Sequence, residues 1–402
     1  MRKELIQLEN ISNSLQKVNI IFQQSADVDS HLICEVLNTM EEINLNLFGC
    51  RRLPAYSFDE DADNTVLFRE QYEKWLNMLS DELQYRKSLP NIIDYDFYTF
   101  ISHVAVMSKE ELTKEAVSCL ESIRQADNAY YENIKKSYNS YRHFWGTLDL
   151  ENGNINLIEN RVHEIKSHLE DFIWLYGNLA DYRSKKVLYG ILRYWLTFDC
   201  EYKNSIKENN YDDYYDFDIL NCGQDEILVD LGAWVGDSTL SYIHNFGTYK
   251  RIYCYEMTDV SMSALQENLK DFDNIIYRQV AVGNINNNVY RTNYEHSTSG
   301  NFISSKGNVE IPMVRLDDDI SEPVTFIKMD IEGSELEAMK GAELHIRKDK
   351  PKLAVCSYHN NHHIYEIPKL MREYNPEYKL YMRYNGPLDH MFTSEFVTFA
   401  IP

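Results

Sequence analysis

The stretch EILVDLGAWVGDSTL (226–240) joins an apolar run to a turn with two glycines and then to a helix start. Its first seven residues predict a buried strand, and the helix is expected to begin near Asp237. Gly232 and Gly236 bracket the turn, where the backbone can approach a ligand closely and the helix N-terminus supplies free N–H groups. The G-x-x-x-G spacing differs from the G-x-G-x-x-G of dinucleotide-binding turns, so pyrophosphate is a poorer fit.

Downstream of this stretch, expected strands alternate with expected helices. Asp259 can cap a helix that runs through Leu269, and residues 284–316 are interpreted as an insertion with a short hairpin. The alternation predicts an α/β fold with a mostly parallel sheet covered on both faces. The further expected strands cover residues 251–256, 275–282, 324–330, 352–358, 378–384 and 395–401.

The first half of the chain shows helical rather than strand periodicity. Residues 1–48 carry an apolar stripe that fits either a helix packed on its own domain or a short coiled-coil dimer contact. Residues 51–66 are expected to form a loop. Helical patterns return over 67–150 and over 156–206, with a break expected near residues 177–181.

A polar, acidic stretch at 208–218 separates the helical part from the α/β part, and we place a domain boundary there. We therefore expect a helical N-terminal region at 1–154, a helical lead-in at 155–218 and an α/β domain at 219–402. The N-terminal helices are candidates for a homodimer contact or for shaping substrate access.

The chain has 402 residues and a net charge of −23, which argues against a nucleic-acid substrate and against docking on anionic lipid. Its seven cysteines are scattered and odd in number, as expected for reduced thiols in a cytoplasmic protein. The opening MRKELIQLEN lacks the apolar run of a signal peptide, and no membrane-spanning stretch is expected.

Glu256 lies twenty residues after Gly236, at the end of the second expected strand. An acidic side chain at that place can accept hydrogen bonds from both hydroxyls of a ribose. Without a phosphate-cradling turn before it, the pattern favours a nucleoside ligand that carries a cation, and S-adenosylmethionine fits. The alternative is a structural turn followed by a solvated glutamate.

Several segments of the C-terminal half together resemble one family. They are VDLGAWVGDSTL, AVGN (281–284), VRLDD (314–318), FIKMDIEGSELEAMKGAE (326–343), and PKLAVCSYHN (351–360) with the later IYEIP. Over roughly residues 222–402 the sequence resembles the FkbM family of S-adenosylmethionine-dependent methyltransferases. The resemblance implies the class I methyltransferase fold, a Rossmann-like seven-stranded sheet whose last strand is antiparallel. It also implies methyl transfer, usually to a hydroxyl of a sugar or natural product.

The resemblance further implies a set of cofactor-binding residues. Met257 and Trp234 depart from the family, where many members have Pro and Asn, and both lie beside the expected cofactor pocket. The residues carried over to the S-adenosylmethionine site are Asp230, Gly232, Ala233, Trp234, Gly236, Asp237, Ser238, Thr239, Glu256, Met257, Gln279, Val280 and Ala281.

The stretch FIKMDIEGSELE (326–337) is expected to begin as a core strand, yet it places Lys328, Asp330 and Glu332 on one side. Ligands of open parallel sheets sit at the carboxyl ends of the strands, so these charges are expected at a pocket. The next strand brings His359 to the same edge. His359, Asp330 and Glu332 are candidate general bases, with His359 favoured because its ordinary pKa is nearest neutrality.

Each of these residues also has a structural interpretation. Lys328 could orient Asp330 or Glu332, or be a plain buried ion pair, and His359 could be a satisfied histidine without a catalytic part. Ser334 and Glu337 form a capping-box pattern. His359, His362 and His363 with Asp330 raise the question of a metal, but their spacing matches no known ligand set, so no metal is predicted.

The sequence therefore favours an S-adenosylmethionine-dependent O-methyltransferase that acts on a hydroxyl of a saccharide or glycosylated metabolite. An N-methyltransferase is a near variant without its usual motif. The alternative of a different class is a helical interaction or oligomerisation module joined to an inactive cofactor-binding domain. An NAD-dependent oxidoreductase is disfavoured by the glycine spacing.

Overall fold

The computed structural model describes residues 91–211, 213–292, 300–386 and 395–402, together with isolated positions between 15 and 89. The chain divides into two compact units, Met1–Leu112 and Thr113–Pro402. Apart from Leu15 and Gln16, which are helical, the predicted helix over 1–48 and the predicted loop over 51–66 lie outside the described residues. The coiled-coil contact therefore stays a prediction.

The described part of the first unit contains α4 (Ile92–Val106), which begins at Asn91, where the side chain accepts a hydrogen bond from Asp94 N at 3.0 Å. α5 (Lys109–Ala126) crosses the division between the units. The further helices before the sheet are α6 (Asn128–Ser140), α7 (Arg142–Trp145), α8 (Asn156–Ser167), α9 (Leu169–Asn178), α10 (Tyr182–Thr197) and α11 (Cys200–Ser205). The break expected near 177–181 is confirmed.

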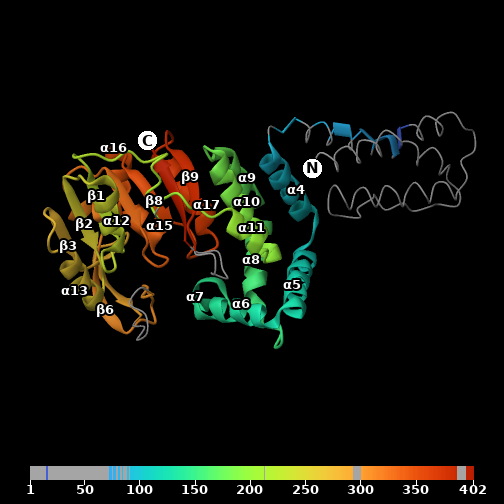
Figure 1. Ribbon diagram of the computed structural model, residues 1–402, viewed down its shortest axis with the longest axis horizontal. Coiled ribbons are helices and arrows are strands. Elements are labelled where there is room, and N and C mark those ends of the chain that lie inside the picture. Colours follow the sequence, from blue (N-terminus) through green and yellow to red (C-terminus); the bar gives the residue numbers. More distant parts are fainter. Residues whose placement is uncertain are drawn as a thin grey trace, which may run out of the picture. The chain divides into compact units, whose positions relative to one another are not determined.

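A seven-stranded sheet in the order β3-β2-β1-β7-β8-β10-β9 forms the C-terminal part of the second unit (Figure 1). Only β10 runs antiparallel to its neighbours, so the predicted fold with an antiparallel last strand is confirmed. All five residues of β1 are buried, which requires cover on both faces of the sheet. The strands are β1 (Ile227–Leu231), β2 (Arg251–Tyr255), β3 (Ile275–Arg278), β7 (Phe326–Met329), β8 (Lys352–Cys356), β9 (Lys379–Tyr384) and β10 (Phe396–Ile401).

The expected strand over 275–282 is wrong as a single element. Its second half is β4 (Ala281–Val282), which leaves the main sheet after β3 and pairs with β6 (Val309–Val314). β6 also pairs antiparallel with β5 (Asn287–Arg291), which confirms the predicted hairpin in the insertion. The backbone changes sheets at Gln279 because β6 offers a second pairing edge there.

The helices of the sheet domain begin close to the expected positions. They are α12 (Asp237–Phe246), α13 (Asp259–Asn268), α14 (Leu316–Asp319), α15 (Glu335–Gly341), α16 (Glu343–Asp349) and α17 (His363–Tyr374). Thr258, not Asp259, is the N-cap of α13, and Asp259 instead accepts a hydrogen bond from the side chain of Gln279. The capping box of α15 does not form, because Glu337 pairs with Lys340 on its own helix.

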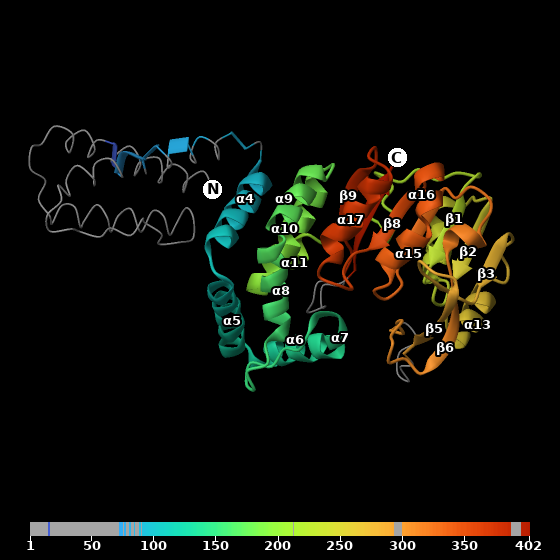
Figure 2. The same cartoon turned by 180° about the vertical axis from the view of Figure 1, so that it is seen from behind.

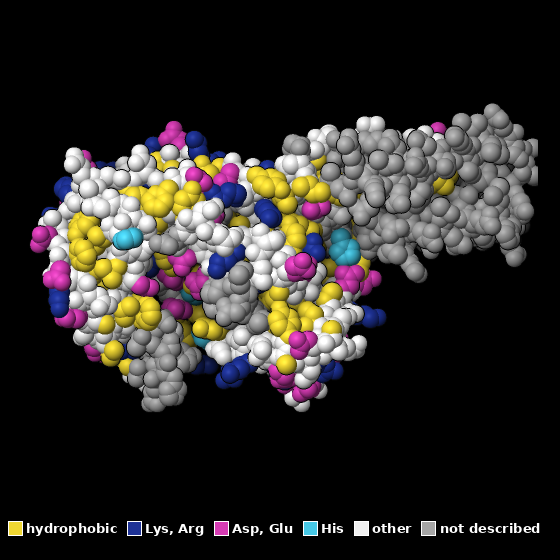
Figure 3. Space-filling view, viewed as in Figure 1, with side chains coloured by type: hydrophobic (Ala, Val, Ile, Leu, Met, Phe, Trp, Pro, Cys, Tyr) yellow, Lys and Arg dark blue, Asp and Glu magenta, His cyan; other side chains and the backbone are white. Residues whose placement is uncertain are grey.

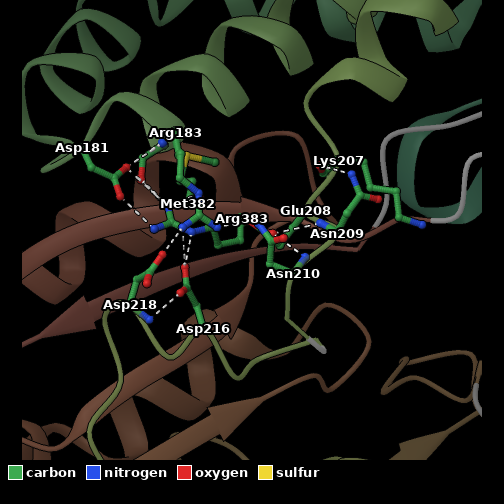
Figure 4. Close-up of polar contacts among 11 residues, drawn as sticks. Asp181, Arg183, Lys207, Glu208, Asn209, Asn210, Asp216, Asp218, Met382 and Arg383 are labelled. Carbon is green, nitrogen blue, oxygen red and sulfur yellow. Dashed lines mark hydrogen bonds and ion pairs between the residues drawn. The ribbon is translucent and has the colours of Figure 1, made fainter.

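The helical lead-in packs against the β9 edge of the sheet, where α10 lies beside that strand, α8 and α11 pack on α10, and α9 packs on α17 (Figures 1 and 2). The contact is polar as well as apolar. The Arg383 guanidinium reaches Asp181, the N-cap of α10, at 2.8 Å, and it also pairs with Asp216 (Figure 4). Arg183 pairs with Glu208, Asp216 and Asp218 in the same cluster. These arginines are neutralised within the fold.

The turn after β1 depends on a glycine at position 232. Gly232 has a φ of +78°, and a Cβ there would lie 1.8 Å from the carbonyl oxygen of Asp330. The neighbouring strand β7 therefore ends directly against this turn. Only a residue without a side chain permits both the backbone conformation and the close approach.

We expect Gly232→Ala to lower the free energy of unfolding by about 3 kcal/mol or more, because backbone strain and a backbone clash add. Gly247→Ala is the matched control, since Gly247 has a φ of +70° with open space where the Cβ would lie. The Gly247→Ala variant has the backbone strain without the clash, so it should lower the free energy of unfolding by about 1 kcal/mol. Urea denaturation compares the two variants, and equal losses would contradict the close approach at Gly232.

Candidate active site

A buried ion pair joins the ends of β1 and β7. Asp230 and Lys328 are direct partners in the parallel register, and their side chains are 0% and 3% exposed. Lys328 Nζ lies 3.0 Å from Asp230 Oδ1 and donates to the carbonyl oxygen of Gly232 at 2.9 Å. The expectation that Lys328 pairs with Asp330 or Glu332 is therefore corrected: its partner is Asp230, because the strand register places them side by side.

The other oxygen of Asp230 fixes the start of α12. Ser238 Oγ and Thr239 Oγ1 donate to Asp230 Oδ2 at 2.6 and 2.7 Å. Burial alone would lower the pKa of Lys328. The charges of Asp230 and then Asp330 raise it by more than burial lowers it, so the pKa lies above its ordinary value. Lys328 keeps its charge, and this charge is held inside the fold by Asp230. The geometry favours the buried ion pair for Lys328 over direct work on a substrate.

A pocket opens at the carboxyl ends of β1, β2 and β7, with about 860 Å³ of empty space including the part open to solvent. Among the residues predicted to bind the cofactor, those that line it are Gly232, Trp234, Asp237, Ser238, Glu256, Met257, Val280 and Ala281. Of the predicted catalytic residues, Lys328, Asp330 and Glu332 line it as well.

The other predicted cofactor residues do not line this pocket. Asp230, Ala233 and Thr239 are buried behind its wall. Gly236 has a φ of +90° and faces the side chain of Leu265, so it shapes the turn. Gln279 is exposed. These residues position the pocket rather than form its surface.

The sequence prediction missed several lining residues, namely Tyr214, Tyr255, Thr258, Val282, Asn301, Ile303, Ile331 and Ser334. Tyr214 belongs to the acidic stretch at 208–218, in which no element was predicted. Its hydroxyl donates to Asp330 Oδ2 at 2.7 Å, and Lys328 Nζ lies 4.9 Å from its ring centroid. No periodic pattern marks such a residue, because only tertiary packing brings it to the pocket.

Glu256 has the features required of a ribose-binding carboxylate. It is buried at the end of β2, and its Oε1 accepts hydrogen bonds from the backbone and hydroxyl of Thr258 at 2.7 and 2.8 Å. Burial raises the pKa of Glu256, although these hydrogen bonds act against the rise. A partly desolvated carboxylate that lines a pocket gains from hydroxyl donors. The pocket therefore fits the nucleoside end of S-adenosylmethionine.

His359 lies behind the pocket among carboxylates and is 2% exposed. Its Nδ1 is 2.9 Å from Glu335 Oε1, and its Nε2 is 3.4 Å from Glu332 Oε2 and 3.6 Å from Asp330 Oδ1. Glu335 is fully buried and was assigned no site role from the sequence. The structure thus brings together His359, Asp330 and Glu332 as predicted, and adds Glu335 as the residue that holds the ring.

The charges of this cluster follow from its geometry. Burial lowers the pKa of His359, but Glu335 and Glu332 raise it more, so it lies well above its ordinary value. Burial raises the pKa of Glu332, and the imidazole reduces that rise. His359 is therefore an imidazolium near neutral pH, and an imidazolium cannot accept a proton.

Asp330, Glu335 and His359 also place one possible ligand atom each within 4.8 Å of one another. Both ring nitrogens of His359 face carboxylate oxygens, as expected when both carry protons. A metal ligand needs a nitrogen lone pair. The distances thus describe a histidine ring held between carboxylates.

The strand order and the pocket at the carboxyl ends of β1 and β2 define the class I methyltransferase fold. Residues 230–380 match the sequence model of the methyltransferase FkbM domain. The chain therefore contains an FkbM methyltransferase domain, which confirms the resemblance noted in the sequence. This match supports S-adenosylmethionine as the cofactor.

A methyltransferase FkbM from Methylobacillus flagellatus KT is structurally similar, with a TM-score of 0.51 and 28% identity over 61% of this chain. This chain spans 63% of that protein's length. An rRNA methylase from Streptococcus thermophilus is more distant. Its TM-score is 0.28 and its identity 14%, over 46% of this chain and 89% of that one. Fibrillarin from Aeropyrum pernix, solved with S-adenosyl-L-methionine, is also more distant. Its TM-score is 0.29 and its identity 15%, over 44% of this chain and 66% of that one. A search of curated proteins found no match.

We expect Asp230→Asn to lower the free energy of unfolding by about 3 kcal/mol, because Lys328 would stay buried without a countercharge. Lys328→Met should cost a similar amount for the converse reason. The double variant should lose less than the sum of the single variants by about 1 kcal/mol or more, as measured by urea denaturation. Strict additivity would show that the two side chains do not interact.

Glu395 gives a prediction for pH dependence. Burial, followed by the charges of Asp330 and Asp213, raises the pKa of Glu395 to about 8. The folded state then binds this proton more tightly than the unfolded state, so Glu395 lowers stability as the pH rises from about 4.3 to about 8. Nearby Glu332 adds to the rise, and His359 opposes it.

Glu395→Gln should therefore gain stability relative to the unchanged protein between about pH 5 and about pH 9, by on the order of 2 kcal/mol. Denaturation curves at both pH values measure the difference. Glu343→Gln is the control, because Glu343 is an exposed partner of Arg347 on α16. A pH-independent difference for Glu395→Gln would show that its carboxyl group titrates normally.

Proposed function

We propose that this protein transfers the methyl group of S-adenosylmethionine to a hydroxyl of a saccharide or glycosylated metabolite. The observation that carries the proposal is the position of two carboxylates. Asp330 and Glu332 line the same pocket as Glu256, and both side chains are 23% exposed. An acceptor hydroxyl in the pocket can therefore contact a carboxylate while the cofactor occupies the Glu256 side.

When bound, the cofactor supplies a methyl carbon that its sulfonium already activates, so the protein has to align the hydroxyl and take up its proton. The C–S bond breaks as the C–O bond forms. The products are a methyl ether and S-adenosylhomocysteine, and the hydroxyl proton passes to a carboxylate of the protein.

We assign the role of general base to Asp330, with Glu332 as the second candidate. Tyr214 donates to one oxygen of Asp330 and so fixes the carboxylate plane. Its other oxygen faces Tyr358 at 3.4 Å and His359 at 3.6 Å. Because His359 is protonated, we assign it a positioning role and replace our expectation that it is the base.

The cofactor roles follow the lining of the pocket. We assign Glu256 to the ribose hydroxyls, because its carboxylate is buried at the end of β2. The turn from Gly232 to Trp234 and the start of α12 at Asp237 are assigned to the methionine end. Val280 and Ala281 are assigned to the adenine side.

The wider setting of the enzyme is also a proposal. We infer a cytoplasmic enzyme without a nucleic-acid partner from the scattered cysteines and the net charge of −23. None of the helices in the described part of the chain is both long and apolar enough for a membrane span. A homodimer through the N-terminal helices remains a proposal that concerns residues outside the described part.

We expect Asp330→Asn to lower kcat by about 10²- to 10⁴-fold while S-adenosylhomocysteine still binds, because the amide cannot accept the proton. Glu256→Gln is the matched change on the cofactor side and should weaken S-adenosylhomocysteine binding by about tenfold or more. Labelled-methyl transfer to a panel of glycans, with the product located by mass spectrometry, measures the first. Calorimetry measures the second.

Two outcomes would contradict the proposal. Unchanged turnover of Asp330→Asn would move the base elsewhere. A protein that neither binds nor is thermally stabilised by S-adenosylhomocysteine would favour the alternative of an inactive domain beside a helical interaction module.

A further inference from the structure

Carboxylates outnumber cations at the acceptor side of the pocket. Asp330 and Glu332 line the pocket, and Tyr358 links them to a further carboxylate, since its hydroxyl lies 3.4 Å from both Asp330 Oδ1 and Glu395 Oε2. Glu335 lies directly behind them against His359. Acidic side chains are also seen around the hollow in the middle of the larger unit in Figure 3.

Few cations balance these charges. Within the described residues, His359 is the one positively charged side chain within 4 Å of Asp330 or Glu332, and Glu395 has none that close. His359 is itself shared with Glu335. Lys328 also lines the pocket, but its direct ion-pair partner is Asp230. The pocket therefore presents an excess of negative charge to whatever enters it.

The proton affinity of Glu395 supports this excess. Burial and then the charges of Asp330 and Asp213 raise the pKa of Glu395 to about 8, so the cluster retains a proton at neutral pH. A bound cation would replace that proton, because it would stabilise the ionised carboxylate. Without a ligand, the proton on Glu395 reduces the repulsion between this carboxyl group and Asp330. A positively charged ligand would reduce the same repulsion in its place.

Aromatic rings at and just before α7 stand next to this cluster of His359 and carboxylates. The Phe144 ring of α7 lies 5.2 Å from His359 and 5.8 Å from Phe302, measured between ring centroids. Tyr141, which is 40% exposed, lies near the same charges. Burial raises the pKa of Tyr141, and Glu332 and Glu395 raise it further. Aromatic faces beside carboxylates attract cations in addition to packing against sugar rings.

We propose that the acceptor carries a positively charged amino group, as an amino sugar does, and that Asp330 and Glu332 hold it beside the hydroxyl to be methylated, with Glu395 adding its charge through Tyr358. This inference rests on the proposed methyltransferase function and narrows its substrate class. Neutral saccharides would leave the carboxylates uncompensated. Phosphorylated or uronic-acid acceptors would be repelled, because like charges at a desolvated site are unfavourable.

The test uses four tetrasaccharides that differ mainly in charge: a glucosamine tetramer, its fully N-acetylated form, a glucose tetramer and a galacturonic acid tetramer. Binding to the full-length protein saturated with S-adenosylhomocysteine is measured by calorimetry at neutral pH. The glucosamine tetramer should bind at least about tenfold more tightly than the N-acetylated form. In buffers of different ionisation enthalpy, its binding to the unchanged protein should also release more protons than its binding to Glu395→Gln.

Glu395→Gln should weaken binding of the glucosamine tetramer by about tenfold and lower the number of protons released on binding, because this titrating carboxyl group is gone. Glu343→Gln, which removes an exposed carboxylate on α16, is the matched control and should bind like the unchanged protein. Equal or tighter binding of a neutral or acidic tetramer would overturn the inference. So would binding of none of the four, or a Glu395→Gln variant that binds and releases protons normally.

Labelled-methyl transfer to the same tetramers separates this inference from the proposed function. Equal methylation of the neutral and the amino tetramer would overturn the charge preference and leave the O-methyltransferase in place. Preferential binding of the amino tetramer, with the label on nitrogen or absent, would overturn transfer to a hydroxyl and leave the cation site in place.

Discussion

The buried pair of Asp230 and Lys328 is the interaction on which the rest of the site depends. One oxygen of Asp230 holds the lysine of the neighbouring strand, and the other accepts from Ser238 and Thr239 at the start of α12. A single carboxylate thus joins β1, β7 and the helix after the turn. Two charges at 0% and 3% exposure are costly unless all partners are present, so the pair specifies one arrangement of the strand ends.

Much of this fold could be predicted because its signals are local. The alternation of apolar strands with helices identified the seven main strands, and the start of α12 at Asp237 followed from the turn chemistry. The errors occur where two local solutions compete. The apolar run at 275–282 is long enough for one strand, but the edge of β6 draws its second half away. At α15, Glu337 forms an ion pair with Lys340 instead of capping the N-terminus of the helix.

The site was less predictable, because its contacts join residues that are distant in sequence. The pattern of FIKMDIEGSELE placed Lys328, Asp330 and Glu332 at a strand end, but the partner of Lys328 follows from the register of β1 on β7. Tyr214 comes from a stretch without periodicity, and Glu395 was expected only as the first residue of the strand 395–401. The protonation of His359 depends on Glu335, whose position in the first turn of α15 suggested only a helix start.

The same ion pair explains why the pocket is acidic. A lysine on β7 would ordinarily offset the carboxylates beside it, but the register gives Lys328 to Asp230 and leaves Asp330 and Glu332 facing the opening. His359 cannot restore the balance, since Glu335 shares its charge. The ion pair that holds the turn after β1 in place therefore leaves the carboxylates at the end of β7 without a lysine as direct partner. The amino group that we propose for the acceptor would supply the positive charge that the register gives to Asp230.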